Sequence, residues 1–161
     1  MVAGVNAQST DALSDQQKSY LPSRTPDRII LNLSDSPLAT LNVNWRTSVD
    51  QQLGKVEWAE AMHSTAFLEN VVSVEANSEF LSVVHETNPT IDAYYHAAQM
   101  SGLEPGKTYV YRVGLDDNWS EWFQGTLPNP EADGISFIYL GDAQNGVRDH
   151  WSRLIRQAYN R

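Results

Sequence analysis

The sequence predicts an all-β protein, an antiparallel β-sandwich, followed by a short strand–helix element of a different architecture. Short apolar segments alternate with polar residues at a period of two, and Gly, Pro, Asn and Asp turns separate these segments. The 161 residues are 41% hydrophobic and 10% aromatic, which suffices for one packed core. After residues 128–130, Pro-Asn-Pro, the pattern changes to a continuous apolar run and then to a helical repeat.

The strands of the sandwich are expected between two flanking segments. Residues 1–25, rich in Ala, Gln, Ser and Asp, predict a flexible arm with one helical turn at 14–20. Pro22 and Pro26 mark the entry to the sandwich, which is expected to span residues 26–128. The clearest strand is 108–114, and it places Tyr109, Tyr111 and Val113 on one face. The other expected strands are 29–33, 41–46, 56–58, 71–76, 80–86, 93–100 and 119–126.

The segment 129–161 predicts the truncated first strand and helix of a second domain. Residues 135–140 form a nearly continuous apolar run, which is typical of a strand buried on both faces of an α/β sheet. A polar loop follows at 141–146. Apolar residues then recur at helical spacing, namely Trp151, Leu154, Ile155, Ala158 and Tyr159.

Charge and composition exclude several functions. The formal charge of −9 disfavours binding to nucleic acid and to anionic membranes. The absence of cysteine excludes disulfides, thiolate metal sites and cysteine nucleophiles. No apolar run has the length of a membrane span, and residues 1–9 lack the basic and apolar regions of a signal peptide.

Four residues are expected to be structural. Residues 102–109 read Gly-Leu-Glu-Pro-Gly-Lys-Thr-Tyr and predict a tyrosine corner, in which a tyrosine hydroxyl bonds back to the backbone upstream. In this arrangement Leu103 fills the core and Tyr109 supplies the hydroxyl. Trp45 and Tyr111 lie on the apolar faces of their strands and are expected to be core residues.

The four histidines do not predict a metal or catalytic site. His63, His85, His96 and His150 show no metal-ligand spacing, and a satisfied or solvated structural role is favoured for each. Residues 116–118, Asp-Asp-Asn, indicate a hairpin turn rather than a cation loop. No catalytic residue is assigned in this chain.

Two tryptophans suggest a surface role. Trp119 and Trp122 are three residues apart, so a continuous strand would place them on opposite faces and expose at least one. An exposed indole could pack against a neighbouring domain or stack on a sugar. The alternative function is therefore an autonomous β-sandwich binding module for carbohydrate or protein.

Asp142 is the one candidate for chemistry. It directly follows the run 135–140 and Gly141, a place where open α/β sheets position their functional groups. A carboxylate there suits a divalent or trivalent cation. Judged on this residue alone, a helix-capping or turn role is at least equal.

Several motifs in order resemble the N-terminal part of a bacterial purple acid phosphatase-like metallophosphoesterase. The resemblance covers about residues 26–161. The motifs are PDRIIL at 26–31, VNWRT at 43–47, GLEPG at 102–106, YVYRVG at 109–114, WSEWF at 119–123 and FIYLGDAQN at 137–145.

The resemblance implies an immunoglobulin/fibronectin-III-like sandwich that precedes a calcineurin-like catalytic domain. It implies that Asp142 matches the first metal-binding aspartate of a two-metal centre of iron, zinc or manganese. Gln144 stands where many relatives carry histidine, so Gln144 is a doubtful ligand. The other family motifs have no counterpart before Arg161. This chain alone is therefore expected to be a non-catalytic accessory domain without a bound cofactor, whose parent hydrolyses phosphate esters.

The resemblance also implies a partner, the missing catalytic domain, and a location. A second copy is expected on other grounds, because the apolar stripe of the helix at 151–159 and the unpaired edges of the strand at 135–140 favour pairing of two C-terminal segments. The parent is expected to be exported to the periplasm or the extracellular space.

Overall fold

The computed structural model describes residues 13–84, 90–134, 136–141 and 147–160. The chain divides into two compact units, Met1–Pro130 and Glu131–Arg161. The first unit contains all of the described β-strands, and the second contains the C-terminal helix. In the described residues no helix is long and apolar enough to cross a membrane.

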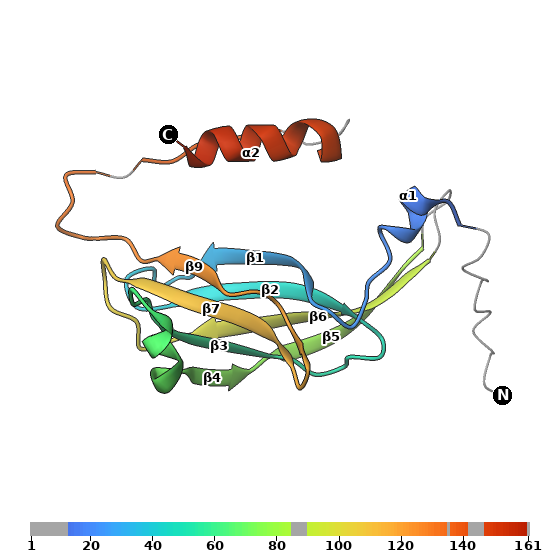
Figure 1. The fold of residues 1–161 in the computed structure, drawn as a ribbon, viewed down its shortest axis with the longest axis horizontal. Coiled ribbons are helices and arrows are strands. Elements are labelled where there is room, and N and C mark those ends of the chain that lie inside the picture. Colours follow the sequence, from blue (N-terminus) through green and yellow to red (C-terminus); the bar gives the residue numbers. More distant parts are fainter. Residues whose placement is uncertain (1–12, 85–89, 135, 142–146, 161) are drawn as a thin grey trace. The chain divides into compact units, whose positions relative to one another are not determined.

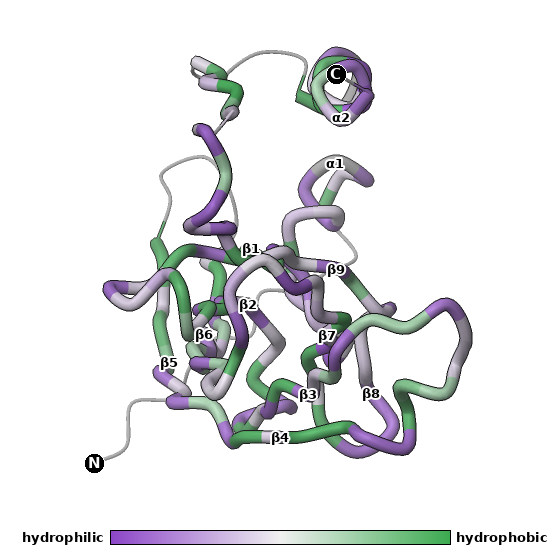
Figure 2. Tube along the Cα trace, turned by 90° about the vertical axis from the view of Figure 1, so that its left-hand side faces the viewer, coloured by the Kyte–Doolittle hydropathy of each residue, from purple (hydrophilic) through white to green (hydrophobic). Residues whose placement is uncertain are grey.

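Two antiparallel sheets form the first unit (Figure 1). One sheet has the order β1 (Asp27–Leu33), β2 (Leu41–Ser48), β6 (Ile91–Met100) and β5 (Asn77–Val83). The other has the order β4 (Val72–Glu75), β3 (Lys55–Glu60), β7 (Thr108–Leu115) and β8 (Asn118–Trp119), and β9 (Phe123–Thr126) also pairs with β7. In Figure 2, β5 and β6 lie on the opposite side of the unit from β7 and β8.

This topology is that of an immunoglobulin-like sandwich. The order β1-β2-β6-β5 corresponds to strands A, B, E and D of a constant-type domain, while β3, β7 and β9 correspond to C, F and G. The predicted all-β, immunoglobulin/fibronectin-III-like class is therefore confirmed. Its strands follow from the period-two pattern, because alternate side chains of a strand face the core.

The core lies between β2 of one sheet and β3 and β7 of the other. Leu41, Val43 and Trp45 alternate along β2 and are at most 2% exposed. The predicted structural residues Leu103, Tyr109 and Tyr111 belong to the same buried cluster as Trp45. Further members of the cluster are Val56, Trp58, Met100, Val113 and Leu127.

A β-bulge in β1 places a carboxylate against a buried arginine. The register shifts between Asp27 and Ile30, and the intervening Arg28 has a φ of 50°. Asp27 consequently lies opposite Arg46, whose side chain is 2% exposed. The Nε and Nη2 atoms of Arg46 donate to the two carboxylate oxygens at 2.8 and 2.6 Å. The Asp27 carboxylate raises the pKa of the Arg46 guanidinium above its ordinary value.

The described part of the N-terminal arm contains the predicted helical turn. The turn is α1 (Asp15–Lys18), and a capping box between Ser14 and Gln17 begins it. Two hydrogen bonds join the following residues to β2. Arg46 Nη2 donates to the Tyr20 carbonyl at 3.1 Å, and the Ser48 amide donates to the Ser23 carbonyl at 2.7 Å. This part of the arm is therefore held against the sheet.

The second unit differs from its prediction in one element. The expected helix is present as α2 (Ser152–Tyr159), preceded by the π-helical turn Val147–Trp151. The expected strand at 135–140 is wrong in this structure, since residues 136–140 pair with no strand and Phe137 and Tyr139 are 80% and 87% exposed. A strand needs a neighbour to share its ladder of hydrogen bonds, and the described residues of this unit contain no other strand.

Candidate functional site

The predicted metal position is not placed by the structure. Asp142 and Gln144 lie outside the described residues, as does His85. Within the described ranges, no three His, Cys, Asp or Glu side chains are grouped so that they could hold a metal ion. His63 and His150 are exposed, and His96 is buried.

His96 is the centre of a buried chain of hydrogen bonds. Its Nε2 lies 2.7 Å from Thr47 Oγ1, and its Nδ1 lies 2.8 Å from Ser78 Oγ. The Thr47 hydroxyl donates to the Gln51 carbonyl at 2.7 Å, so its oxygen accepts a hydrogen bond from the Nε2–H of His96. Nδ1 is then the acceptor for Ser78. Burial lowers the pKa of His96 to about 4, and the ring is therefore neutral at pH 7.

The predicted tyrosine corner is present. The Tyr109 hydroxyl accepts a hydrogen bond from the Glu104 amide at 2.9 Å, and Tyr109 is 7% exposed. The turn before it closes through Gly106, whose φ of 75° suits glycine. Its amide donates to the Pro128 carbonyl at 3.1 Å. The corner therefore joins the β6–β7 connection to the end of the sandwich.

Replacing Tyr109 with phenylalanine is expected to lower the free energy of unfolding by about 1–2 kcal/mol, because the Glu104 amide loses its acceptor. Urea titration followed by far-ultraviolet circular dichroism measures this loss. Tyr94→Phe is the matched control, since Tyr94 is only partly buried. A midpoint identical to that of the unmodified chain would show that the corner bond does not stabilise the fold.

Trp119 and Trp122 both stack on one arginine on the outer face of the second sheet. Arg112 Cζ lies 4.3 Å from the ring centroid of Trp119 and 4.8 Å from that of Trp122. Arg112 also donates twice to Glu57 Oε2, at 2.8 and 2.7 Å. Phe67, from the 3-10 helix Thr65–Asn70, contacts Trp122 edge-on with ring centroids 5.0 Å apart. We call these five residues the Arg112 stack.

The stack corrects the expectation that the two tryptophans lie on opposite faces. The predicted strand 119–126 is interrupted, because residues 120–122 leave the sheet between β8 and β9. The Ser120 hydroxyl accepts from the Val113 amide at 3.1 Å, and the Ser120 amide donates to the Val113 carbonyl at 2.9 Å. This detour brings Trp122 to the same side as Trp119. Both indoles are partly buried and contact the guanidinium, which weakens the idea of a free sugar-binding platform.

Residues 116–118 form the predicted turn. Leu115 pairs with Asn118, so Asp116 and Asp117 are the two residues that join β7 to β8. Gly114 makes the approach possible, since a Cβ there would lie 2.2 Å from the Asn118 carbonyl oxygen. The Trp119 indole donates to the Asp116 carbonyl at 2.7 Å and closes the hairpin. These aspartates therefore serve the turn that positions Trp119.

Comparison with known proteins gives a family match and likenesses to solved structures, among them two fibronectin III domains. The model for the "Purple acid Phosphatase, N-terminal domain" matches residues 26–127. A search of curated proteins finds no match. An fn3 domain of human contactin 1 aligns with a TM-score of 0.45 and 15% identity, over 71% of this chain and 86% of that one. The third fibronectin III domain of human KIAA0343 protein gives 0.40 and 15%, over 83% and 100%.

Proposed function

The chain belongs to the purple acid phosphatase N-terminal domain family, and from this membership we propose that residues 26–128 are the non-catalytic accessory domain of a metallophosphoesterase. The family match carries the proposal, because it spans residues 26–127. The interior supports it, since the buried side chains of Arg46 and His96 both have structural partners. Arg46 is paired with Asp27, and His96 is bonded to Thr47 and Ser78.

The hydrolysis of phosphate esters by the parent is part of the same proposal. Two-metal hydrolysis requires both ions to be clamped about 3.5–4 Å apart. Asp142 is one carboxylate, and within the described residues no three His, Cys, Asp or Glu side chains are grouped so that they could hold a metal ion. One carboxylate does not make a two-metal site, and we propose that the remaining ligands belong to the part of the catalytic domain that follows residues 129–161.

We propose that residues 129–161 begin the catalytic domain. Helix α2 carries the apolar side chains Leu154, Ile155 and Tyr159, which are 41%, 51% and 91% exposed. Burying a large apolar side chain contributes about 1.5–3 kcal/mol, so this side of the helix favours a partner. The sheet of the catalytic domain is the partner that we propose, with a second copy of this segment as the alternative.

An accessory sandwich without a structural metal should keep its fold when metals are removed. We expect the whole chain to unfold cooperatively in urea, with the same midpoint in EDTA as in its absence. We expect the core of apolar side chains to stabilise the fold, without a contribution from a bound metal ion. Far-ultraviolet circular dichroism gives the readout. Loss of the β spectrum on chelation would contradict the proposal.

A further inference from the structure

The outer face of the first sheet carries a group of neighbouring asparagine and glutamine side chains. Asn42 is paired with Asn32 on one side and with Gln99 on the other. One step along, Asn44 is opposite Ala97, which in turn pairs with Asn77 of β5. We call these residues the amide face: Asn32, Asn42, Asn44, Asn77, Ala97 and Gln99.

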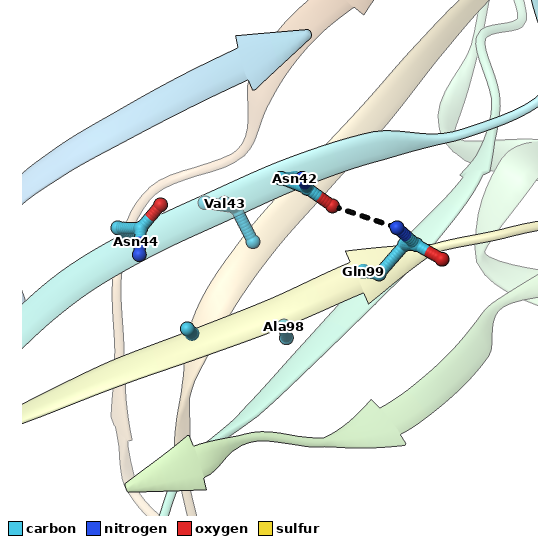
Figure 3. A pocket seen from close by; sticks show the side chains of 6 residues that line it. Asn42, Val43, Asn44, Ala98 and Gln99 are labelled. Atoms are coloured by element: carbon cyan, nitrogen blue, oxygen red, sulfur yellow. Dashed lines mark hydrogen bonds between the residues drawn. The ribbon is translucent and has the colours of Figure 1, made fainter. Parts of the chain in front are cut away.

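The amides are oriented by bonds to one another across the strands. Gln99 Nε2 donates to Asn42 Oδ1 at 3.0 Å, and Figure 3 shows these two side chains pointing toward each other. Asn32 Nδ2 donates to Asn44 Oδ1 at 3.1 Å. Among the described residues, Gln99 Oε1 and the Nδ2 groups of Asn42 and Asn44 have no hydrogen-bond partner. Fixed donors and an acceptor therefore remain available on one surface.

A hollow lies among these side chains. Its volume is about 260 Å³, and it is lined by Asn42, Val43, Asn44, Ala97, Ala98 and Gln99, of which Val43 and Ala98 turn their side chains to the core. This volume is slightly below the roughly 300–1,000 Å³ of typical small-molecule sites. The hollow can therefore receive a small unit such as one ring, while a longer ligand extends over the sheet.

The many asparagines of the amide face are not explained by a preference of asparagine for β-strands. Asparagine is disfavoured in β-strands, yet four of the six residues of the amide face are asparagines within strands. Places where local propensity is violated are often functional sites. Tyr95 precedes Ala97 by two residues on the same face and is 37% exposed, so a ligand that extends along this face from the hollow would reach it.

We propose that the amide face binds a neutral carbohydrate. Amides and sugar hydroxyls each combine donors with acceptors, so fixed amides can bind paired hydroxyls. None of the residues that line the hollow is charged, which disfavours an ionic ligand. The nearest described charge on β2, Arg46, is already paired with Asp27. Tyr95 would stack on the apolar face of a neighbouring ring.

The test is titration of the isotope-labelled 161-residue chain with maltohexaose, cellohexaose, mannohexaose and chitohexaose, followed by ¹⁵N–¹H NMR. The side-chain NH₂ groups of Asn42, Asn44 and Gln99 give their own signals, and we expect these to shift with at least one probe. The glucans represent polysaccharide sources, and the other two represent sugars found on glycoproteins. Asn44→Ala should weaken binding about tenfold through lost hydrogen bonds.

Two variants make the result specific. Asn44→Ala/Gln99→Ala should abolish the shift of the remaining Asn42 NH₂ signal while the chain keeps its circular dichroism spectrum. Gln124→Ala, which removes an exposed amide from β9 of the other sheet, should bind like the unmodified chain. The proposal is overturned if no probe shifts these signals at millimolar concentration, if the shifts persist in the double variant, or if they occur only at the indoles of the Arg112 stack. An amide face that responds only to an added peptide would equally overturn it.

Discussion

Replacing Trp45 with alanine is expected to lower the free energy of unfolding by about 3–5 kcal/mol, the range for removing a large aromatic side chain from a core. Trp45 is 1% exposed and stacks on His96 with ring centroids 5.1 Å apart. A Cβ on Gly54 would lie only 2.8 Å from Trp45 Cζ2, which shows how closely the backbone covers the indole. Truncation would therefore leave a cavity that rigid neighbours cannot fill.

Trp45→Phe is the matched variant. It keeps an aromatic ring, and among the described residues the Trp45 indole N–H has no hydrogen-bond partner to lose. The phenylalanine variant should therefore cost clearly less than the alanine variant in urea titrations. If Trp45→Ala unfolds at the same urea concentration as the unmodified chain, Trp45 is not the core anchor.

The second large effect is a loss of stability in acid through His96. The ordinary histidine pKa of 6.5 applies to the unfolded chain, and burial lowers the folded value to about 4. Between these values the unfolded state binds more protons, so the free energy of unfolding decreases as the pH falls. The contribution of His96 is complete above pH 6.5 and is lost by pH 4. Its full size is about 3 kcal/mol.

Urea midpoints measured at steps from pH 7 to pH 4 test this effect. His96→Gln is the matched variant, because an amide can bond to Thr47 and Ser78 but does not titrate in this range. The variant is expected to be less stable at pH 7 and to vary less with pH. An identical slope in both proteins would show that other groups cause the acid sensitivity.

Local patterns predicted much of the sandwich. The alternation around Trp45 identified β2, and the turn chemistry of residues 102–109 identified the corner of Tyr109, because both depend on neighbours in sequence. The helical spacing at 151–159 likewise predicted α2. Strand ends were less exact, since β5 begins at Asn77 rather than at residue 80.

The surface sites depend on pairing between distant residues. The Arg112 stack requires the chain to leave the sheet at 120–122, and a period-two interpretation of 119–126 therefore placed Trp122 on the wrong face. The sequence did contain one signal for this stack. Arg112 alternates with the core residues Tyr111 and Val113, so its guanidinium faces outward, where tryptophan rings can stack on it. The amide face depends on the register of β1, β2, β6 and β5, which no single segment encodes.

The apolar run at 135–140 shows a different limit. Hydrophobicity alone indicated a strand, but a strand also requires a neighbouring strand with unpaired backbone groups. In the part of the second unit that the structure describes, α2 and its preceding turn are the regular elements. The run therefore has the composition of a buried strand, but the described residues of the second unit provide no sheet with which it could pair.

Phosphatase activity of the 161-residue chain is the measurement that tests most directly whether it is a non-catalytic accessory domain. With iron, zinc or manganese added, from acidic to neutral pH, we expect no hydrolysis of p-nitrophenyl phosphate above the buffer rate. The reason is that the described residues hold no group of metal ligands and a single aspartate cannot clamp two ions. Turnover that co-purifies with the chain and disappears in Asp142→Ala would contradict the assignment.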